Sequence, residues 1–99
     1  MYLDQSKILQ LQLYFKTAPV LKAYLFGSYS RGEATVSSDI DILLDLDYSD
    51  HIGLRFIQMK LDLEALLSVQ IDLVSSNGIS EFIQPYIESE KELIYERKS

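Results

Sequence analysis

The sequence predicts an α/β domain built on a small mixed β-sheet that is flanked by helices. Two observations predict this class: helical and extended segments alternate along the chain, and one segment alternates between mostly acidic and wholly apolar positions. The chain has 99 residues, 47% of them hydrophobic, which suits one domain with one core and is too apolar for a disordered chain. We therefore expect a single domain over residues 1–99.

Helices are expected where apolar residues recur every three or four positions. Residues 4–17 show this spacing, with Asp4 or Ser6 as the capping residue and Pro19 as the signal that ends the helix. Residues 52–68 show it over the longest stretch, with an apolar face broader than that of an ordinary surface helix. Either core burial or surplus surface for a partner explains this breadth. Two shorter helices are expected at residues 28–33 and 80–88.

Three short segments are expected to be strands, at residues 20–26, 39–47 and 69–74. In the second of these, positions 40, 42, 44 and 46 are all apolar, which predicts one fully buried face. The long helix between the second and third strands favours parallel pairing, and the shorter turn through residues 28–38 suits antiparallel neighbours. The sheet is therefore expected to be mixed. Residues 91–95 fit either a further strand or the end of the preceding helix.

Composition excludes several classes of function. Nine Lys and Arg against 15 Asp and Glu give a net charge of −6, and a general nucleic-acid binder needs a basic face instead. The chain has no cysteine, which excludes a disulfide scaffold, a thiolate zinc site and a cysteine nucleophile. No apolar run reaches the roughly 18–20 residues that span a bilayer, and the N-terminus lacks a signal-peptide layout. We expect a soluble, cytoplasmic protein with no membrane and no nucleic-acid partner.

Three aspartates are candidates for metal binding. Asp39 and Asp41 are two residues apart in one expected strand, so they project from the same face with α-carbons roughly 6.6 Å apart. Adjacent carboxylates repel unless a cation separates them, and oxygen-only ligands favour magnesium or manganese. Asp72 stands in the next strand between apolar neighbours, where an aspartate is costly unless it is paired or bound to metal. If the two strands are adjacent, the three acids form a two-ion site suited to in-line displacement at phosphorus.

A glycine turn lies ten residues before the acidic pair. Gly27 permits a close backbone approach at the end of a strand, and free N–H groups at the start of the following helix favour a phosphate. Ser28 adds a hydroxyl donor, and Arg31 offers positive charge one turn later. Most of the seven tyrosines are expected to pack in the core, with Tyr29 as the candidate exception because it lies inside this turn. Taken singly, Gly27 and Ser28 are typical of an ordinary turn, Arg31 of a surface charge, and the aspartates of a solvated strand face. Together, these residues predict a phosphate-binding turn that faces a metal site.

These residues resemble a known signature. Gly27-Ser28, ten intervening residues and Asp39-Ile40-Asp41 resemble the signature of the DNA polymerase beta-like nucleotidyltransferase superfamily. The fuller string, with Ser30-Arg31-Gly32, is similar to the minimal nucleotidyltransferase (MNT) branch, although Ser30 stands where alanine is more usual. The resemblance covers most of the chain, because the third carboxylate of the family falls on Asp72. It implies the polymerase beta-like nucleotidyltransferase fold.

The resemblance also implies roles for these side chains. Asp39 and Asp41 are implied to bind two Mg²⁺ ions, and Asp72 to assist the catalytic ion and the attacking hydroxyl. The residues implied to hold the triphosphate of ATP are Gly27, Ser28 and Arg31. Many MNT proteins are antitoxins paired with a HEPN-type toxin, which they neutralise by transferring AMP to a toxin hydroxyl or by binding it. The resemblance therefore implies a hetero-oligomer of adenylyltransferase and toxin; the alternative is a non-catalytic acidic module that masks the toxin.

Overall fold

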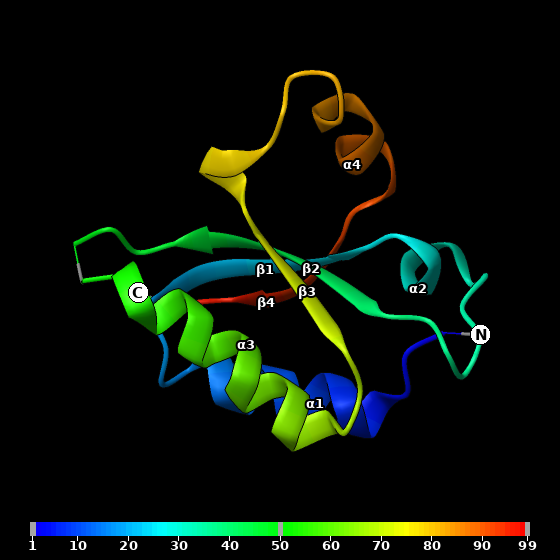
Figure 1. Cartoon of the computed structure of the whole chain (residues 1–99), viewed down its shortest axis with the longest axis horizontal. Coiled ribbons are helices and arrows are strands. Elements are labelled where there is room, and N and C mark those ends of the chain that lie inside the picture. Colours follow the sequence, from blue (N-terminus) through cyan, green and yellow to red (C-terminus); the bar gives the residue numbers. More distant parts are fainter. Residues whose placement is uncertain (1, 50, 99) are drawn as a thin grey trace.

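A four-stranded sheet organises the chain, with its strands in the order β3-β2-β1-β4 (Figure 1). This computed structural model describes residues 2–49 and 51–98. Strand β1 is antiparallel to both β2 and β4, whereas β2 and β3 are parallel. The mixed sheet is therefore confirmed. Of residues 91–95, which the sequence left open, all but the first belong to a strand that runs on to Glu96. The strands are β1 (Val20–Phe26), β2 (Ile40–Leu46), β3 (Ile71–Ser75) and β4 (Glu92–Glu96).

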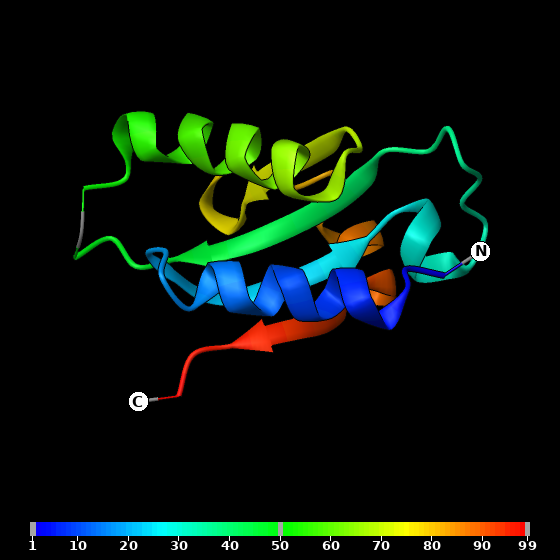
Figure 2. The same ribbon diagram turned by 90° about the horizontal axis from the view of Figure 1, so that it is seen from below.

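Helices cover the two faces of the sheet unequally. The long helices α1 (Gln5–Phe15) and α3 (Gly53–Leu67) lie side by side on one face, and α4 (Gln84–Glu90) stands on the opposite side (Figures 1 and 2). Two short elements, α2 (Ser28–Arg31) and the 3-10 helix η1 (Ser76–Gly78), follow β1 and β3 respectively. In the described ranges, no helix is both long enough and apolar enough to cross a bilayer.

Capping and proline chemistry set the helix ends. The Asp4 carboxylate accepts a hydrogen bond from the Ser6 N–H at 2.8 Å, so Asp4 is the cap of α1. The prediction of a helix over 80–88 is wrong at both ends. Residues 81–83 form a turn, α4 begins only at Gln84, and it ends at Glu90. Pro85 explains the later start, since proline lacks an N–H and is tolerated only in the first turn of a helix.

The core lies between the sheet and the α1–α3 layer. The alternate residues of β2 supply its centre: Ile40, Ile42 and Leu44 are fully buried. Phe15 from α1 and Met59 from α3 are also fully buried and belong to the same cluster. The prediction of one wholly apolar face on this strand is confirmed, and that face holds the opposite, acidic face of β2 in a fixed place.

The broad apolar face of α3 is only partly buried. Met59 and Leu63 are fully buried. The second apolar stripe of this helix is exposed: 82% of Leu54, 57% of Ile57 and 53% of Leu61 remain open to solvent. Core burial therefore explains one stripe, and the other is surplus apolar surface, the explanation that favours a partner.

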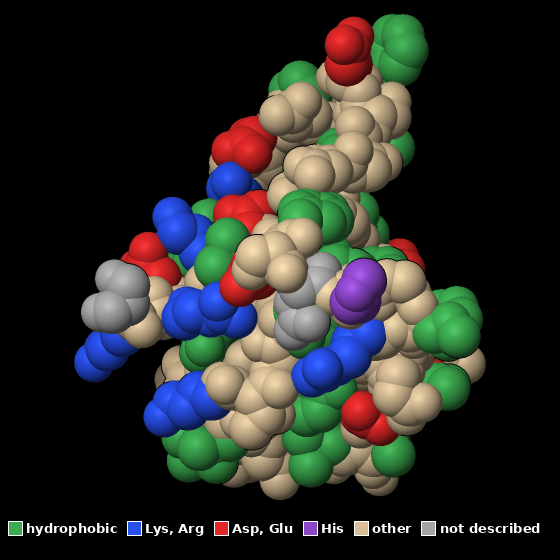
Figure 3. Space-filling view, turned by 90° about the vertical axis from the view of Figure 1, so that its left-hand side faces the viewer, with side chains coloured by type: hydrophobic (Ala, Val, Ile, Leu, Met, Phe, Trp, Pro, Cys, Tyr) green, Lys and Arg blue, Asp and Glu red, His purple; other side chains and the backbone are tan. Residues whose placement is uncertain are grey.

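Basic side chains gather at one end of the molecule, where β4 ends (Figure 3). A hollow of about 680 Å³ lies there, lined in part by Lys16, Arg97 and Lys98. Arg97 donates to the Asp47 carboxylate at 2.6 Å and to the Ala18 carbonyl at 3.2 Å. This hollow adjoins the β4 end of the sheet and is lined by none of the three predicted acids, so it is not the candidate site.

Candidate active site

The strand register brings two of the three predicted acids together. Asp41 of β2 is directly opposite Asp72 of β3 in the parallel pairing, so the two side chains share one face of the sheet on neighbouring strands. Asp39 lies two residues before Asp41, just ahead of β2. Asp41 is partly buried, whereas Asp39 and Asp72 are exposed.

Asp41 is the acid on this face whose ionisation its surroundings disfavour. Burial, followed by the charges of Asp72 and Asp39, raises the pKa of Asp41 to about 6, and the nearby charge of Arg31 offsets only part of this. The three acids are therefore close enough to repel one another. A cation placed among them would relieve that repulsion.

The Gly27 turn lies directly against Asp41. Phe26, the last residue of β1, is paired with Asp41, and Gly27 follows it with φ +72° and ψ −153°, a conformation that is essentially limited to glycine. A Cβ atom added at Gly27 would overlap with the Asp41 Oδ2 atom. The absence of a side chain at this position therefore lets the backbone turn touch the acidic face.

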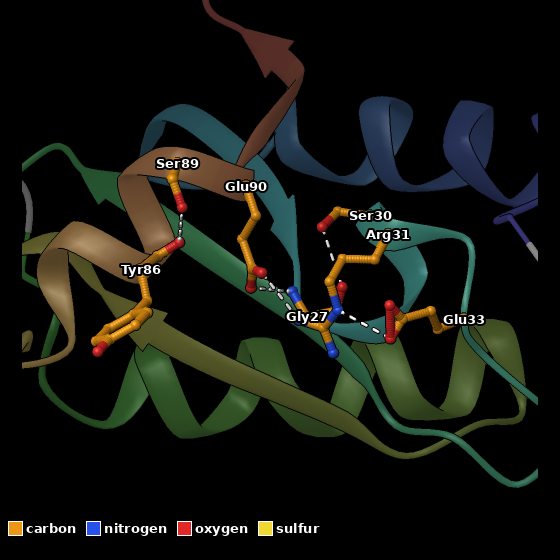
Figure 4. A network of polar contacts seen from close by, with 7 residues as sticks. All are labelled: Gly27, Ser30, Arg31, Glu33, Tyr86, Ser89 and Glu90. Carbon is orange, nitrogen blue, oxygen red and sulfur yellow. Dashed lines mark hydrogen bonds and ion pairs between the residues drawn. The ribbon is translucent and has the colours of Figure 1, made fainter.

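Arg31 lies at the other end of this turn and is held by two carboxylates (Figure 4). Its Nε donates to Glu33 at 3.2 Å, and its Nη1 donates to Glu90 at 2.8 Å. The same Glu90 carboxylate accepts the Gly27 N–H at 3.0 Å. Ser28 opens α2 between these residues and is partly buried.

Sequence reasoning missed Glu90. It lies 63 residues after Gly27, in a segment rich in glutamates that looks like a solvated helix face. No local pattern distinguishes it from Glu88 or Glu92.

Tyr29 does not contact a ligand site in this structure. Its side chain is only 4% exposed and belongs to the main core cluster. Tyr29 therefore packs in the core and is not an exception among the tyrosines. Because α2 is short and sits directly on the sheet, one of its side chains must point inward, and the aromatic ring supplies that packing.

The acidic face fits a hard divalent cation, although the ligands are not preassembled. In residues 2–49 and 51–98, no three carboxylate or imidazole side chains converge closely enough to hold an ion alone. Mg²⁺ is usually held by one or two carboxylates together with substrate phosphates. The in-register pair Asp41 and Asp72, with Asp39 beside them and the Gly27 turn opposite, matches that donor set of oxygens.

We expect the free energy of unfolding of the metal-free protein to depend on pH through the ionisation of Asp41. Its pKa is about 6 in the folded chain against 3.8 in the unfolded chain, so protonation stabilises the fold below that lower value and this gain is lost as pH rises through 6. Asp41→Asn should therefore gain stability relative to wild type between pH 4 and pH 7, measured by urea denaturation without metal.

Asp47 offers a control of opposite sign. Hydrogen bonds from Ser49 and Arg97 lower the pKa of Asp47 to about 2, so its ionised form stabilises the fold above pH 4 and this gain is lost as pH falls. Asp47→Asn should therefore lose stability relative to wild type at neutral pH. If Asp41→Asn also lost stability at neutral pH, the Asp41 carboxylate would not be in a repulsive cluster.

Comparison with known proteins identifies the family of this chain. The family model described as Polymerase beta, Nucleotidyltransferase matches residues 9–99. A protein of Methanocaldococcus jannaschii, which carries the provisional name protein adenylyltransferase MJ0126, is 42% identical over 74 residues. That alignment covers 72% of this chain and 70% of the archaeal protein.

Solved structures share the fold. A crystal structure of a toxin-antitoxin with AMP-PNP aligns with a TM-score of 0.73 and 26% identity, over 97% of this chain and 76% of that chain. A provisionally named minimal nucleotidyltransferase aligns with a TM-score of 0.65 and 31% identity, over 89% of this chain and 86% of the other. The predicted polymerase beta-like fold is confirmed. The chain belongs to the polymerase beta nucleotidyltransferase family and, within it, to the minimal nucleotidyltransferases.

Proposed function

We propose that this nucleotidyltransferase transfers AMP from ATP to a hydroxyl group of a protein, in a reaction that depends on Mg²⁺. One observation carries the proposal: the Gly27 turn touches Asp41, which is paired in register with Asp72. Backbone donors for a polyphosphate and carboxylates for a cation are thus adjacent, as phosphoryl chemistry requires. The name of the archaeal relative supports a protein as the acceptor, and the AMP-PNP in the structural neighbour supports ATP as the donor.

Each residue of the site has a proposed role in the transfer. Gly27 and Ser28 bind the phosphates and Arg31 contributes charge to them. The acceptor oxygen forms a bond to the α-phosphorus, the bond from that phosphorus to the pyrophosphate oxygen breaks, and Asp72 accepts the hydroxyl proton. Mg²⁺ held by Asp39, Asp41 and Asp72 would neutralise charge on the phosphate oxygens, and two ions are proposed. Pyrophosphate leaves beside the Gly27 turn.

A toxin of the HEPN type is the proposed partner, in a hetero-oligomer with this chain. The structural neighbour is a toxin-antitoxin, and the exposed stripe of α3 supplies apolar surface for an interface. This stripe also favours the second candidate function, an antitoxin that masks the toxin without turnover. A cytoplasmic location stays a prediction, in keeping with ATP as the proposed donor.

Labelled ATP separates the two candidates. The chain is incubated with Mg²⁺, ATP labelled on the α-phosphate and the candidate partner, and the partner is analysed by intact mass spectrometry. Catalysis predicts a covalent AMP on the partner that requires metal and is absent with EDTA. A stable complex that neutralises the partner with no added AMP would instead establish masking.

A further inference from the structure

Glu90 joins both ends of the glycine turn to the rest of the fold. One of its carboxylate oxygens accepts the Gly27 N–H at 3.0 Å, and the other accepts from Arg31 Nη1 at 2.8 Å (Figure 4). These are the residues before and at the end of α2, which is only four residues long. A helix this short is not stable by itself, so its position depends on such tertiary contacts.

The backbone at Gly27 is held by a contact from another part of the fold. Its φ of +72° and ψ of −153° are open to glycine without strain, but glycine is also the residue with the most conformational freedom, so its own chemistry does not fix the turn. No side chain caps the start of α2. The hydrogen bond to Glu90 is the contact that fixes the Gly27 amide, and the fixed amide keeps the turn against Asp41.

Glu90 is built into a rigid part of the fold. It is the last residue of α4, two residues before the start of β4, and β4 pairs with β1, the strand that ends at Phe26. Its side chain is 23% exposed, against 65% for Glu33, the other carboxylate on Arg31. Burial by itself would raise the pKa of Glu90, but the bonds from Arg31 and Gly27 outweigh it and hold the pKa below its usual value. The carboxylate is therefore ionised at neutral pH, as a charge-assisted contact requires.

We propose that Glu90 is a positioning residue for nucleotide transfer: by accepting the Gly27 N–H and one Arg31 N–H, it holds the turn so that the backbone donors after Gly27 and the remaining guanidinium N–H groups of Arg31 face the triphosphate. It acts through these two residues and touches neither the nucleotide nor the acceptor. The inference rests on the proposed function only for the identity of the ligand. The tethering of the turn by Glu90 stands on the hydrogen bonds alone.

Glu33 supplies a matched control, because it contacts Arg31 but makes no bond to Gly27. Glu90→Ala, Glu90→Gln and Glu33→Gln are compared by titration with AMP-PNP and Mg²⁺. We expect the dissociation constant to rise about tenfold in Glu90→Ala, by a smaller factor in Glu90→Gln, which keeps an acceptor, and less than about twofold in Glu33→Gln. The Gln variant keeps the test valid should the Ala variant not fold.

Amide hydrogen exchange gives a readout without nucleotide. The Gly27 amide should exchange at least about tenfold faster in Glu90→Ala than in wild type, and at the wild-type rate in Glu33→Gln. Unchanged exchange, or AMP-PNP binding to Glu90→Ala as tight as to wild type, would overturn the proposal. A wild-type chain that fails to bind AMP-PNP would contradict the proposed function, and the exchange rate would still decide whether Glu90 holds the turn.

Discussion

Replacing Asp41 by asparagine should abolish AMP transfer while the fold stays intact. Asp41 is the most buried of the three acids, is paired in register with Asp72 and lies against the Gly27 turn. An amide of the same shape lacks the charge that makes a carboxylate a ligand for hard cations. We expect the rate of transfer at saturating ATP to fall by at least about a thousandfold, because the lost charge acts on the transition state.

The loss should be specific to chemistry. The thermal midpoint of Asp41→Asn at pH 7 should equal or exceed that of wild type, because the substitution removes a repelled carboxylate from the cluster. Asp45→Asn, four residues further along β2, is the matched control and should keep most of the activity. Transfer is measured as labelled AMP on the partner protein. Retained incorporation by Asp41→Asn would refute the assignment of Asp41.

Replacing Gly27 by alanine should damage both the fold and the activity. The added Cβ atom would overlap with Asp41 Oδ2, and the backbone there adopts φ +72°, which an alanine adopts only under strain. Strain of this kind costs about 1–3 kcal/mol. The turn must also move away from Asp41, which separates the phosphate donors from the acids. We therefore expect a clear fall in the midpoint of urea denaturation together with loss of transfer.

Gly78→Ala is the matched control for this substitution. A Cβ atom at Gly78 would have no neighbour within 4 Å, and its backbone φ is not in the left-handed region. This variant should be close to wild type in both stability and transfer. If Gly27→Ala behaved in the same way, the contact between the turn and Asp41 would not matter for either property.

The periodic parts of the fold were predictable because burial imposes them. The alternation in residues 39–47 follows from one face of β2 packing on the α1–α3 layer, where Ile40, Ile42 and Leu44 are fully buried. The parallel pairing of β2 and β3 followed from the long helix between them. Connectivity therefore made β2 and β3 expected neighbours, and the observed register puts Asp72 opposite Asp41. Its role in metal binding stays a proposal.

The parts that could not be predicted depend on contacts distant in sequence. Residues 91–95 carry no periodicity that separates a strand from a helix end, and pairing with β1 decides the matter. Tyr29 was misassigned because the short α2 turns its ring into the core, which spacing alone does not reveal. Glu90 was missed since its function comes from meeting Gly27 and Arg31 across the fold.

A crystal structure with Mn²⁺ and AMP-PNP tests the central claim most directly, because anomalous scattering locates the metal independently of the protein. We expect anomalous density bounded by the carboxylates of Asp41 and Asp72 on one side and by phosphate oxygens on the other, with the triphosphate against the amide groups of the Gly27 turn. Metal or triphosphate bound elsewhere, for example in the basic hollow beside β4, would contradict the proposed site.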